Sequence, residues 1–207
     1  MPTDPTTTPT TPADARVTIR RANPADAAEV VAMVQGIADL EDQATHVHVD
    51  LEQWRRLLTR PDVTVLLAER GGRAVGYVSA IRQLHLWTGG DVLNLDDLYV
   101  RPGHRDAGIG RQLMAALAAV AARAQLLIRW GMEVDNVDAQ RFYRRLGAAL
   151  RPKVLAAWPT ERVRRRGRRP QTQPRTRRRT RRNYRSERAR RPEGSALPPA
   201  PPNRRPQ

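Results

Sequence analysis

The stretch from Leu95 to Gly110 has the residue types and spacing of an anion-binding turn. An apolar strand carrying two adjacent carboxylates, Asp96 and Asp97, leads through a short turn to two glycines, Gly108 and Gly110, at the expected start of a helix. The first N–H groups of a helix lack intrahelical acceptors, the helix dipole favours negative charge there, and glycine lets a phosphate approach the backbone. The pattern predicts a diphosphate site built largely from main-chain amides.

Two well-known phosphate-binding motifs do not fit this stretch. It lacks the Gly-Lys-Ser/Thr ending of a P-loop and the third glycine of the dinucleotide-binding fingerprint. Two glycines at a strand-to-helix turn are by themselves more often structural, so a purely structural turn is the alternative.

A second stretch, residues 136–148, reads NVDAQRFYRRLGA and follows the first after one expected helix and one expected strand. Together, Arg105-x-x-Gly108-x-Gly110 and this Asn-x-x-Ala-x-x-Phe-Tyr-x-x-x-Gly pattern resemble the GNAT superfamily of N-acetyltransferases. The resemblance covers residues 16–158 and is strongest from 93 to 149. It implies a GNAT fold: a mixed α/β architecture whose central, mostly antiparallel sheet is splayed between its fourth and fifth strands and flanked by about four helices.

The resemblance implies acetyl-CoA as cosubstrate and no metal. In the family the strand main chain pairs with the pantetheine arm and polarises the thioester carbonyl, while the turn holds the diphosphate. The residues so implied are Leu98, Tyr99 and Val100 on the strand, Arg105, Asp106, Ala107, Gly108, Ile109, Gly110 and Arg111 in the turn, and Asn136. Many members carry glycine where this chain has Asp106, which adds a carboxylate near the phosphates. Asn136 either contacts the cofactor or caps the following helix.

The same resemblance suggests the groups that move protons. Tyr143 matches the family tyrosine that serves as general acid toward the coenzyme A sulfur; the alternative is a tyrosine that only packs its helix. Asp96 is expected to act as a base through water or to bind a cationic amine, unless it is an ordinary strand carboxylate. Adjacent strand residues face opposite sides, so only one of Asp96 and Asp97 should face the slot.

Residues elsewhere are expected to shape the acceptor site. Asp42 lies after the first helix, where it either attracts an amine cation or is a solvated helix end, and Trp87 either rims the acceptor pocket or covers core. The expected acceptor is a small-molecule primary amine, such as a polyamine, an amino acid or an amino sugar, attacked directly in a ternary complex. The alternatives are protein N-termini or lysines, or a nucleic-acid-binding protein with a non-catalytic acetyl-CoA domain. A homodimer is an open expectation.

The elements that must position these residues follow from hydrophobic periodicity and turn signals. Asn23-Pro24 predicts a helix start, and Gly71-Gly72 predicts a tight hairpin. We expect a strand at 17–20, helices at 24–40 and 50–58, strands at 63–68, 74–81 and 92–100, a helix at 108–124, a strand at 126–132, a helix at 137–146 and a weaker strand at 150–157. This order predicts a mixed sheet with helices on its faces.

The composition limits the remaining classes. There is no cysteine, which removes disulfides, thiolate zinc sites and cysteine nucleophiles. The longest apolar run, residues 113–122, is far shorter than the roughly 20 residues that span a bilayer, and nothing in residues 1–15 resembles a signal peptide. The four histidines lack the spacing of metal ligands. These features predict a cytoplasmic protein that binds neither metal nor membrane.

The net charge of +16 is unevenly distributed. Residues 161–207 contain 18 Arg and three Glu, whereas residues 1–160 have a net charge of only +1. Low apolar content predicts that 1–15 and 159–207 are disordered, on either side of a domain at 16–158. The basic tail has three open interpretations: a binding arm for nucleic acid, a passive tail, or GC-rich sequence translated beyond its natural frame.

Overall fold

The computed structural model describes residues 16–167. They divide between Pro152 and Lys153 into two units, which are taken separately. The expectations for residues 1–15 and 168–207 lie outside the described part of the chain.

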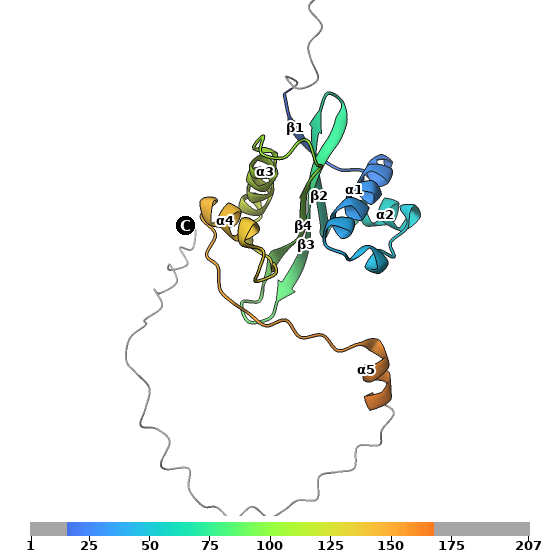
Figure 1. Cartoon of the computed structure of the whole chain (residues 1–207). Helices are drawn as coiled ribbons and strands as arrows, with labels where there is room; N and C mark the ends of the chain where they lie inside the picture. Colours follow the sequence, from blue (N-terminus) through green and yellow to red (C-terminus); the bar gives the residue numbers. More distant parts are fainter. Residues whose placement is uncertain (1–15, 168–207) are drawn as a thin grey trace, which may run out of the picture. The chain divides into compact units, whose positions relative to one another are not determined.

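The first unit is built on a five-stranded sheet whose spatial order equals its chain order (Figure 1). Neighbouring strands are antiparallel except β4 and β5, which run parallel and confirm the mixed sheet. The strands are β1 (Thr18–Arg21), β2 (Val63–Arg70), β3 (Arg73–His85), β4 (Gly90–Val100) and β5 (Leu127–Arg129). The β2–β3 turn is the expected hairpin, with Gly71 at φ +57° and Gly72 at φ +75°.

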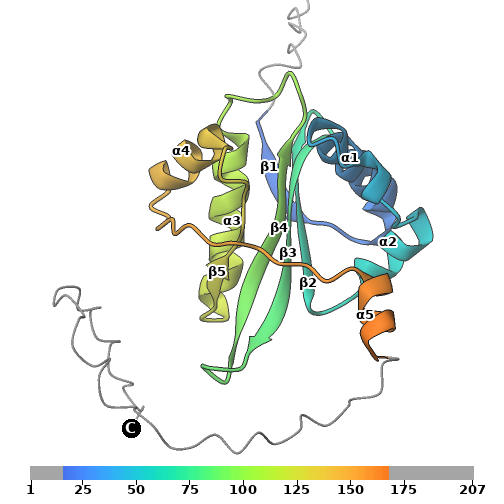
Figure 2. The same cartoon turned by 60° about the horizontal axis from the view of Figure 1, so that its bottom comes forward.

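Helices cover both faces of this sheet. α1 (Ala27–Leu40) and α2 (Leu51–Leu57) lie on one face, and α3 (Ile109–Arg123) and α4 (Val137–Arg145) lie on the other, as both views show (Figures 1 and 2). A 3₁₀ turn, Pro24–Asp26, precedes α1 and is capped by Asn23 as expected. Asp50 caps α2: its side chain accepts from the Gln53 N–H, and its own N–H donates to Gln53 Oε1. A second 3₁₀ turn spans Ala44–His46.

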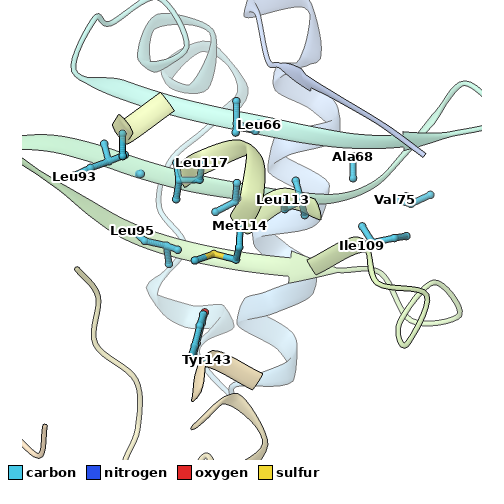
Figure 3. Close-up of a cluster of buried hydrophobic side chains, with 13 residues drawn as sticks. Leu66, Ala68, Val75, Leu93, Leu95, Ile109, Leu113, Met114, Leu117 and Tyr143 are labelled. Carbon is cyan, nitrogen blue, oxygen red and sulfur yellow. The ribbon is translucent and has the colours of Figure 1, made fainter. Parts of the chain in front are cut away.

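Two hydrophobic clusters follow from this layering. The α3 face buries an apolar cluster in which Leu113 and Leu117 are fully enclosed and which also includes Tyr143 (Figure 3). The α1 face buries a second cluster around Tyr77, Met33 and Tyr99. β4 therefore has packed side chains on both faces, which fixes its position between the two halves of the domain.

Three sequence expectations are corrected. Residues 150–157 form no strand, and residues 151–157 are exposed. Pro152 interrupts the run, because proline has no N–H to donate to a strand ladder. β5 is shorter than the expected 126–132. Within the tail expected to be disordered, α5 (Thr160–Gly167) is helical; its Glu161 lies in the first turn and Arg164, Arg165 and Arg166 in the last, the order that the helix dipole favours.

The closest approach of β3 to β4 gives a stability prediction. A Cβ atom at Gly76 would lie 2.7 Å from the main-chain oxygen of Tyr99 and 3.3 Å from Val100 Cγ2. Gly76→Ala should force the strands apart and lower the free energy of unfolding by about 1–3 kcal/mol, measured by urea denaturation. Gly90→Ala, where a Cβ meets no atom within 4 Å, is the control. Equal midpoints for the two variants would contradict the tight contact.

Candidate functional site

The turn between β4 and α3 is fastened to the sheet on one side. Arg101 donates from its main-chain N–H to the Val75 oxygen at 2.9 Å and from Nε to the Ala74 oxygen at 3.0 Å. Its Nη2 also pairs with Glu29 of α1 at 3.0 Å. Arg105 Nε donates to the Val100 oxygen at 3.1 Å, so this side chain holds the turn in place. The loop is thus held in a defined conformation before any ligand binds.

The main-chain N–H groups from Arg105 to Arg111 are unused. None of them donates a hydrogen bond to another described residue, and the first amide that does is Gln112, to the Gly108 oxygen at 3.1 Å. Five of the seven residues, Arg105 to Gly108 and Arg111, are exposed, so their amides are accessible to a ligand from solvent, and the start of α3 adds the positive end of the helix dipole. These seven amides have the chemistry of a diphosphate cradle, and the residues present fit that group.

Glycine is needed in this cradle for the backbone conformation. Gly108 is the N-cap of α3 at φ +73°, it has no side chain to cap the free amides, and a Cβ placed there would meet no atom within 4 Å. Asp106 also has a positive φ, +62°, at the position where the family often has glycine. Gly110 lies against Phe142 of α4, whose Cζ would be at van der Waals distance, 3.4 Å, from a Cβ at this position.

β4 presents a second set of free main-chain groups. β5 pairs with it only from Val92 to Asn94, so the strands separate beyond that point, as expected for a splayed sheet. Arg101 points its N–H toward β3, and main-chain groups alternate sides along a strand. Leu98 and Val100 therefore direct their N–H and C=O groups toward the side that β5 has left. Tyr99 directs its main chain to β3.

Tyr143 lies on the same face of the sheet as the cradle. It is 7% exposed and packs in the α3 cluster, where its side chain points from α4 toward Leu95 of β4 and Met114 of α3 (Figure 3). Burial raises the pKa of Tyr143 to about 12, so its hydroxyl stays protonated at neutral pH and is able to donate a proton. Packing and proton donation are both compatible with this placement.

Trp130 is a neighbour of this site that the sequence reasoning missed. Its ring lies 4.7 Å from that of Tyr143, and Phe142 contacts Tyr143 from the other direction with ring centroids 5.1 Å apart. The two rings fix the orientation of the Tyr143 side chain. The apolar alternation of residues 126–132 placed Trp130 at the end of a strand. That pattern does not say that its ring contacts Tyr143.

Asp96 and Asp97 do not follow the regular alternation expected of them. The register of β3 on β4 passes from Val78↔Leu98 to Ala80↔Leu95, so both aspartates lie opposite the single residue Ser79 in a β-bulge. Asp97 is half-buried and accepts hydrogen bonds from the Tyr77 hydroxyl at 2.9 Å and the Ser79 hydroxyl at 3.4 Å. Asp96 is exposed.

The bulge creates an acidic region on the α1 face. Desolvation raises the pKa of Asp97, and the nearby charges of Asp96 and of Glu41, just after α1, act in the same direction. The pKa of Tyr77 is raised as well, mainly by burial and then by Asp97. None of the three carboxylates forms an ion pair with another residue between 16 and 167. Tyr77 and Ser79 were not identified from the sequence, because their proximity to Asp97 depends on the register of β3 on β4.

The remaining expected site residues lie apart from this region or play a structural part. Asp42 is exposed directly after α1 at φ +54°. Trp87 is 96% exposed in the turn between β3 and β4, so it does not cover core. Asn136 caps α4, accepting from the Ala139 N–H at 3.0 Å. Across residues 16–167 no cluster of potential metal ligands occurs, and no helix there has the length and apolarity to cross a membrane.

Comparison with known proteins gives relatives for this arrangement. The chain is 29% identical to thialysine N-epsilon-acetyltransferase of Sus scrofa over 145 residues, covering 65% of this chain and 85% of the relative. The mouse (Mus musculus) protein of the same name is also 29% identical, covering 63% and 82%.

Solved structures share the fold. An aminoglycoside acetyltransferase from an uncultured soil metagenomic sample matches with a TM-score of 0.62 at 17% identity, covering 70% of this chain and 95% of that one. The ribosomal-protein-alanine N-acetyltransferase of Brucella melitensis matches with a TM-score of 0.57 at 24% identity, covering 69% and 99%.

The family model for the acetyltransferase (GNAT) family matches residues 31–148, a range that contains the amide cradle, the β4 bulge and Tyr143. The chain therefore belongs to the acetyltransferase (GNAT) family and is an acetyl-CoA-dependent N-acetyltransferase.

Proposed function

We propose that this enzyme transfers the acetyl group of acetyl-CoA to a primary amine of a small molecule, such as a polyamine, an amino acid or an amino sugar. The observation that carries the proposal is the position of two complementary regions along β4: free amides that suit a diphosphate, and unpaired carboxylates that suit a cationic amine. A strand with a charged cosubstrate at one end and a cationic acceptor beside it brings the two reactants together.

The cosubstrate part rests on the cradle. The seven amides from Arg105 to Arg111 would hold the diphosphate of acetyl-CoA, with the Arg111 side chain adding positive charge. Arg105 contributes mainly by holding the turn through Val100. The free main-chain groups of Leu98 and the free N–H of Val100 would pair with the amide-containing pantetheine arm and polarise the thioester carbonyl.

The proton movements are assigned by environment. Acetyl-CoA supplies an electrophilic thioester carbonyl and a sulfur leaving group. Tyr143, kept protonated by its raised pKa, donates its hydroxyl proton to the departing sulfur. An alkylammonium has a pKa of about 10.4, so the acceptor amine is protonated at neutral pH. It must lose a proton before it attacks. We assign the acceptance of that proton to Asp96, through water, since its side chain is exposed to solvent.

Binding of the acceptor is assigned to the acidic region. Asp97 is half-buried without an ion-pair partner among the described residues, so an approaching ammonium would offset the desolvation that raises the pKa of this carboxyl. Glu41 and Asp42 at the end of α1 would add attraction for the same cation. The names of the pig and mouse relatives place their acetylated nitrogen at an ε-amine, which supports an aliphatic amine acceptor.

The reaction is proposed to proceed by direct attack in a ternary complex. The chain contains no cysteine, so no cysteine acyl intermediate is available. Initial rates should therefore give intersecting rather than parallel double-reciprocal lines when acetyl-CoA and amine are varied. Parallel lines would indicate a covalent acyl-enzyme and contradict this mechanism.

The acceptor class is tested by a coenzyme A release screen. Spermidine, free amino acids, aminoglycosides and peptides with free N-termini or lysines should be compared at equal amine concentration. We expect turnover with at least one small-molecule class and little with the peptides. Turnover restricted to peptides would replace the small-molecule assignment with protein acetylation, and no turnover with any amine would contradict the proposed function.

The diphosphate cradle predicts the effect of a charge at Gly108. Gly108→Glu should weaken acetyl-CoA binding by about tenfold or more, equivalent to about 1.4 kcal/mol, because it places a carboxylate among the free amides. The matched control is Gly103→Glu, which has a similar φ of +83°, equally open surroundings and the same added charge outside the cradle. Calorimetry with acetyl-CoA measures both. Equal affinities in the two variants would place the phosphates elsewhere.

Tyr143→Phe separates proton donation from packing. The phenyl ring keeps the contacts with Trp130 and Phe142, so acetyl-CoA affinity should stay within about twofold, while kcat should fall by about 10²–10⁴. Steady-state rates and calorimetry measure the two quantities. Wild-type kcat in the variant would leave Tyr143 with a packing role only.

Asp97→Asn tests the acceptor carboxylate. Asparagine still accepts from Tyr77 but carries no charge, so kcat/KM for the amine should fall while acetyl-CoA affinity is kept. The pKa of Asp97 is raised in the folded state, so the folded protein favours the protonated carboxyl. The stability that this contributes is fully present below the unfolded pKa and is lost as pH rises through the folded pKa.

The variant should therefore be more stable than wild type at pH 7, and this advantage should shrink as pH falls toward about 3, below the unfolded pKa of an aspartate. Urea denaturation at several pH values measures it. Asp62→Asn, a change at a partly exposed carboxylate paired with Arg60, is the control. An unchanged kcat/KM together with unchanged stability would contradict both the charge and the role assigned to Asp97.

A further inference from the structure

Gly36 lies inside α1, where glycine is an unfavourable residue. Apart from proline, glycine is the residue type that least favours a helix interior, because it loses the most backbone freedom on folding. The helix continues for another turn to Leu40, so Gly36 does not end it. The presence of glycine here therefore needs a reason outside the helix.

The contact with Tyr99 of β4 supplies that reason. A Cβ atom at position 36 would lie 2.6 Å from the Tyr99 hydroxyl oxygen and 3.1 Å from Tyr99 Cζ. Non-bonded heavy atoms in a packed interior prefer separations of roughly 3.5–4.0 Å, so a side chain at this position would collide with the tyrosine. α1 lies this close to β4 only because residue 36 is glycine.

Tyr99 has little room to move away from Gly36. Its side chain is 6% exposed. The ring lies 6.2 Å from that of Tyr77, which is fully buried and whose hydroxyl donates to Asp97 at 2.9 Å. A continuous set of contacts thus connects α1, through the two tyrosines, with the acidic region on β4.

The C-terminal end of α1 is tied to the turn that contains Gly36. The main-chain N–H of Glu41 donates to the oxygen of Ile37, the residue after Gly36, at 3.1 Å. Glu41 therefore moves together with this turn of the helix. Its charge is near enough to contribute to the raised pKa of Asp97. The position of α1 against β4 thus sets the distance between these two carboxylates.

We propose that Gly36 is a positioning residue for the acceptor amine. It allows α1 to contact Tyr99 and thereby holds Glu41 close to Asp97, so that one ammonium group of the acceptor interacts with both carboxylates. This inference rests on the assignment of acceptor binding to the acidic region and adds the contact that sets the spacing of its charges. Attraction between charges falls with distance, so a shift of α1 away from β4 weakens amine binding.

The test measures spermidine binding and not turnover. The full-length wild type and each variant are saturated with coenzyme A, which has no acetyl group to transfer, and spermidine is titrated by calorimetry. The ammonium groups of spermidine test the acidic region even where another amine is the better acceptor. The affinity for acetyl-CoA is measured in a separate titration.

Gly36→Ala should weaken spermidine binding by about two- to fivefold, the range for one partly screened charge that moves away from a cation. The affinity for acetyl-CoA should be kept, whereas a general loss of packing would weaken both ligands. Gly90→Ala adds the same methyl group where no atom lies within 4 Å, so it is the matched control and should bind both ligands as the wild type does.

Two further backgrounds show how Gly36 acts. Tyr99→Phe removes the oxygen that a Cβ would meet at 2.6 Å, so Gly36→Ala should cost less spermidine affinity in this background than in the wild type. Glu41→Gln removes the charge that Gly36 positions, so Gly36→Ala should cost almost nothing further there. Glu41→Gln alone, a change at an exposed side chain, should also weaken spermidine binding and decides the matter if Gly36→Ala does not fold.

The possible failures are distinguishable. Equal spermidine affinity in Gly36→Ala and the wild type, with a loss in Asp97→Asn, would overturn this inference but leave the acidic region as the acceptor site. An undiminished loss from Gly36→Ala in both backgrounds, or unchanged binding in Glu41→Gln, would also contradict it. A wild type that does not bind spermidine would remove this inference together with the role of the acidic region. Acetyl transfer itself is tested separately by the coenzyme A release screen.

Discussion

The arrangement of the candidate site depends on main-chain hydrogen-bonding groups that are left without partners. β4 is paired with β3 along its length, but β5 follows it only as far as Asn94. The strand continues to Val100 and turns into α3 through a loop whose amides from Arg105 onward donate to nothing within the described residues. Polar main-chain groups in folded proteins nearly always have a hydrogen-bond partner. A row of free groups is therefore able to pair with a linear ligand that carries amides and phosphates.

Rigid packing keeps these groups free. β4 is held by a side-chain cluster on each face, and Arg101 fastens the following loop to β3 and to α1. Without these anchors the loop would be able to rearrange and satisfy its own amides. The entropy of ordering the loop is therefore lost on folding and not on ligand binding, so a preorganised site binds its ligand more tightly.

The β-bulge separates the chemistry on the two faces of the sheet. It places Asp97 under α1 with Tyr77, whereas Tyr143 lies on the opposite face with Trp130. A carboxylate region and a protonated tyrosine thus flank one strand from opposite sides.

The sequence by itself determined the family and the order of most elements, and it predicted the amide cradle. These depend on short-range features: the glycines at 108 and 110, the Phe142-Tyr143 pair, and the periodicity of the helices and strands around them. Local patterns are reliable here because a helix start or a hairpin turn is decided by the residues within it. Residues 150–157 show the limit, because an apolar run interrupted by a proline does not form a strand by its pattern alone.

Only the tertiary structure decided which side chains meet. The bulge opposite Ser79 overrode the alternation rule for Asp96 and Asp97, and the same register brought Tyr77 to Asp97. The contact of Trp130 with Tyr143 likewise depends on how α4 packs beside β5. Each of these contacts joins residues from different elements. A shift of one residue in the pairing of β3 with β4 would replace the contacts made across the sheet. A local sequence pattern therefore does not say which side chains meet.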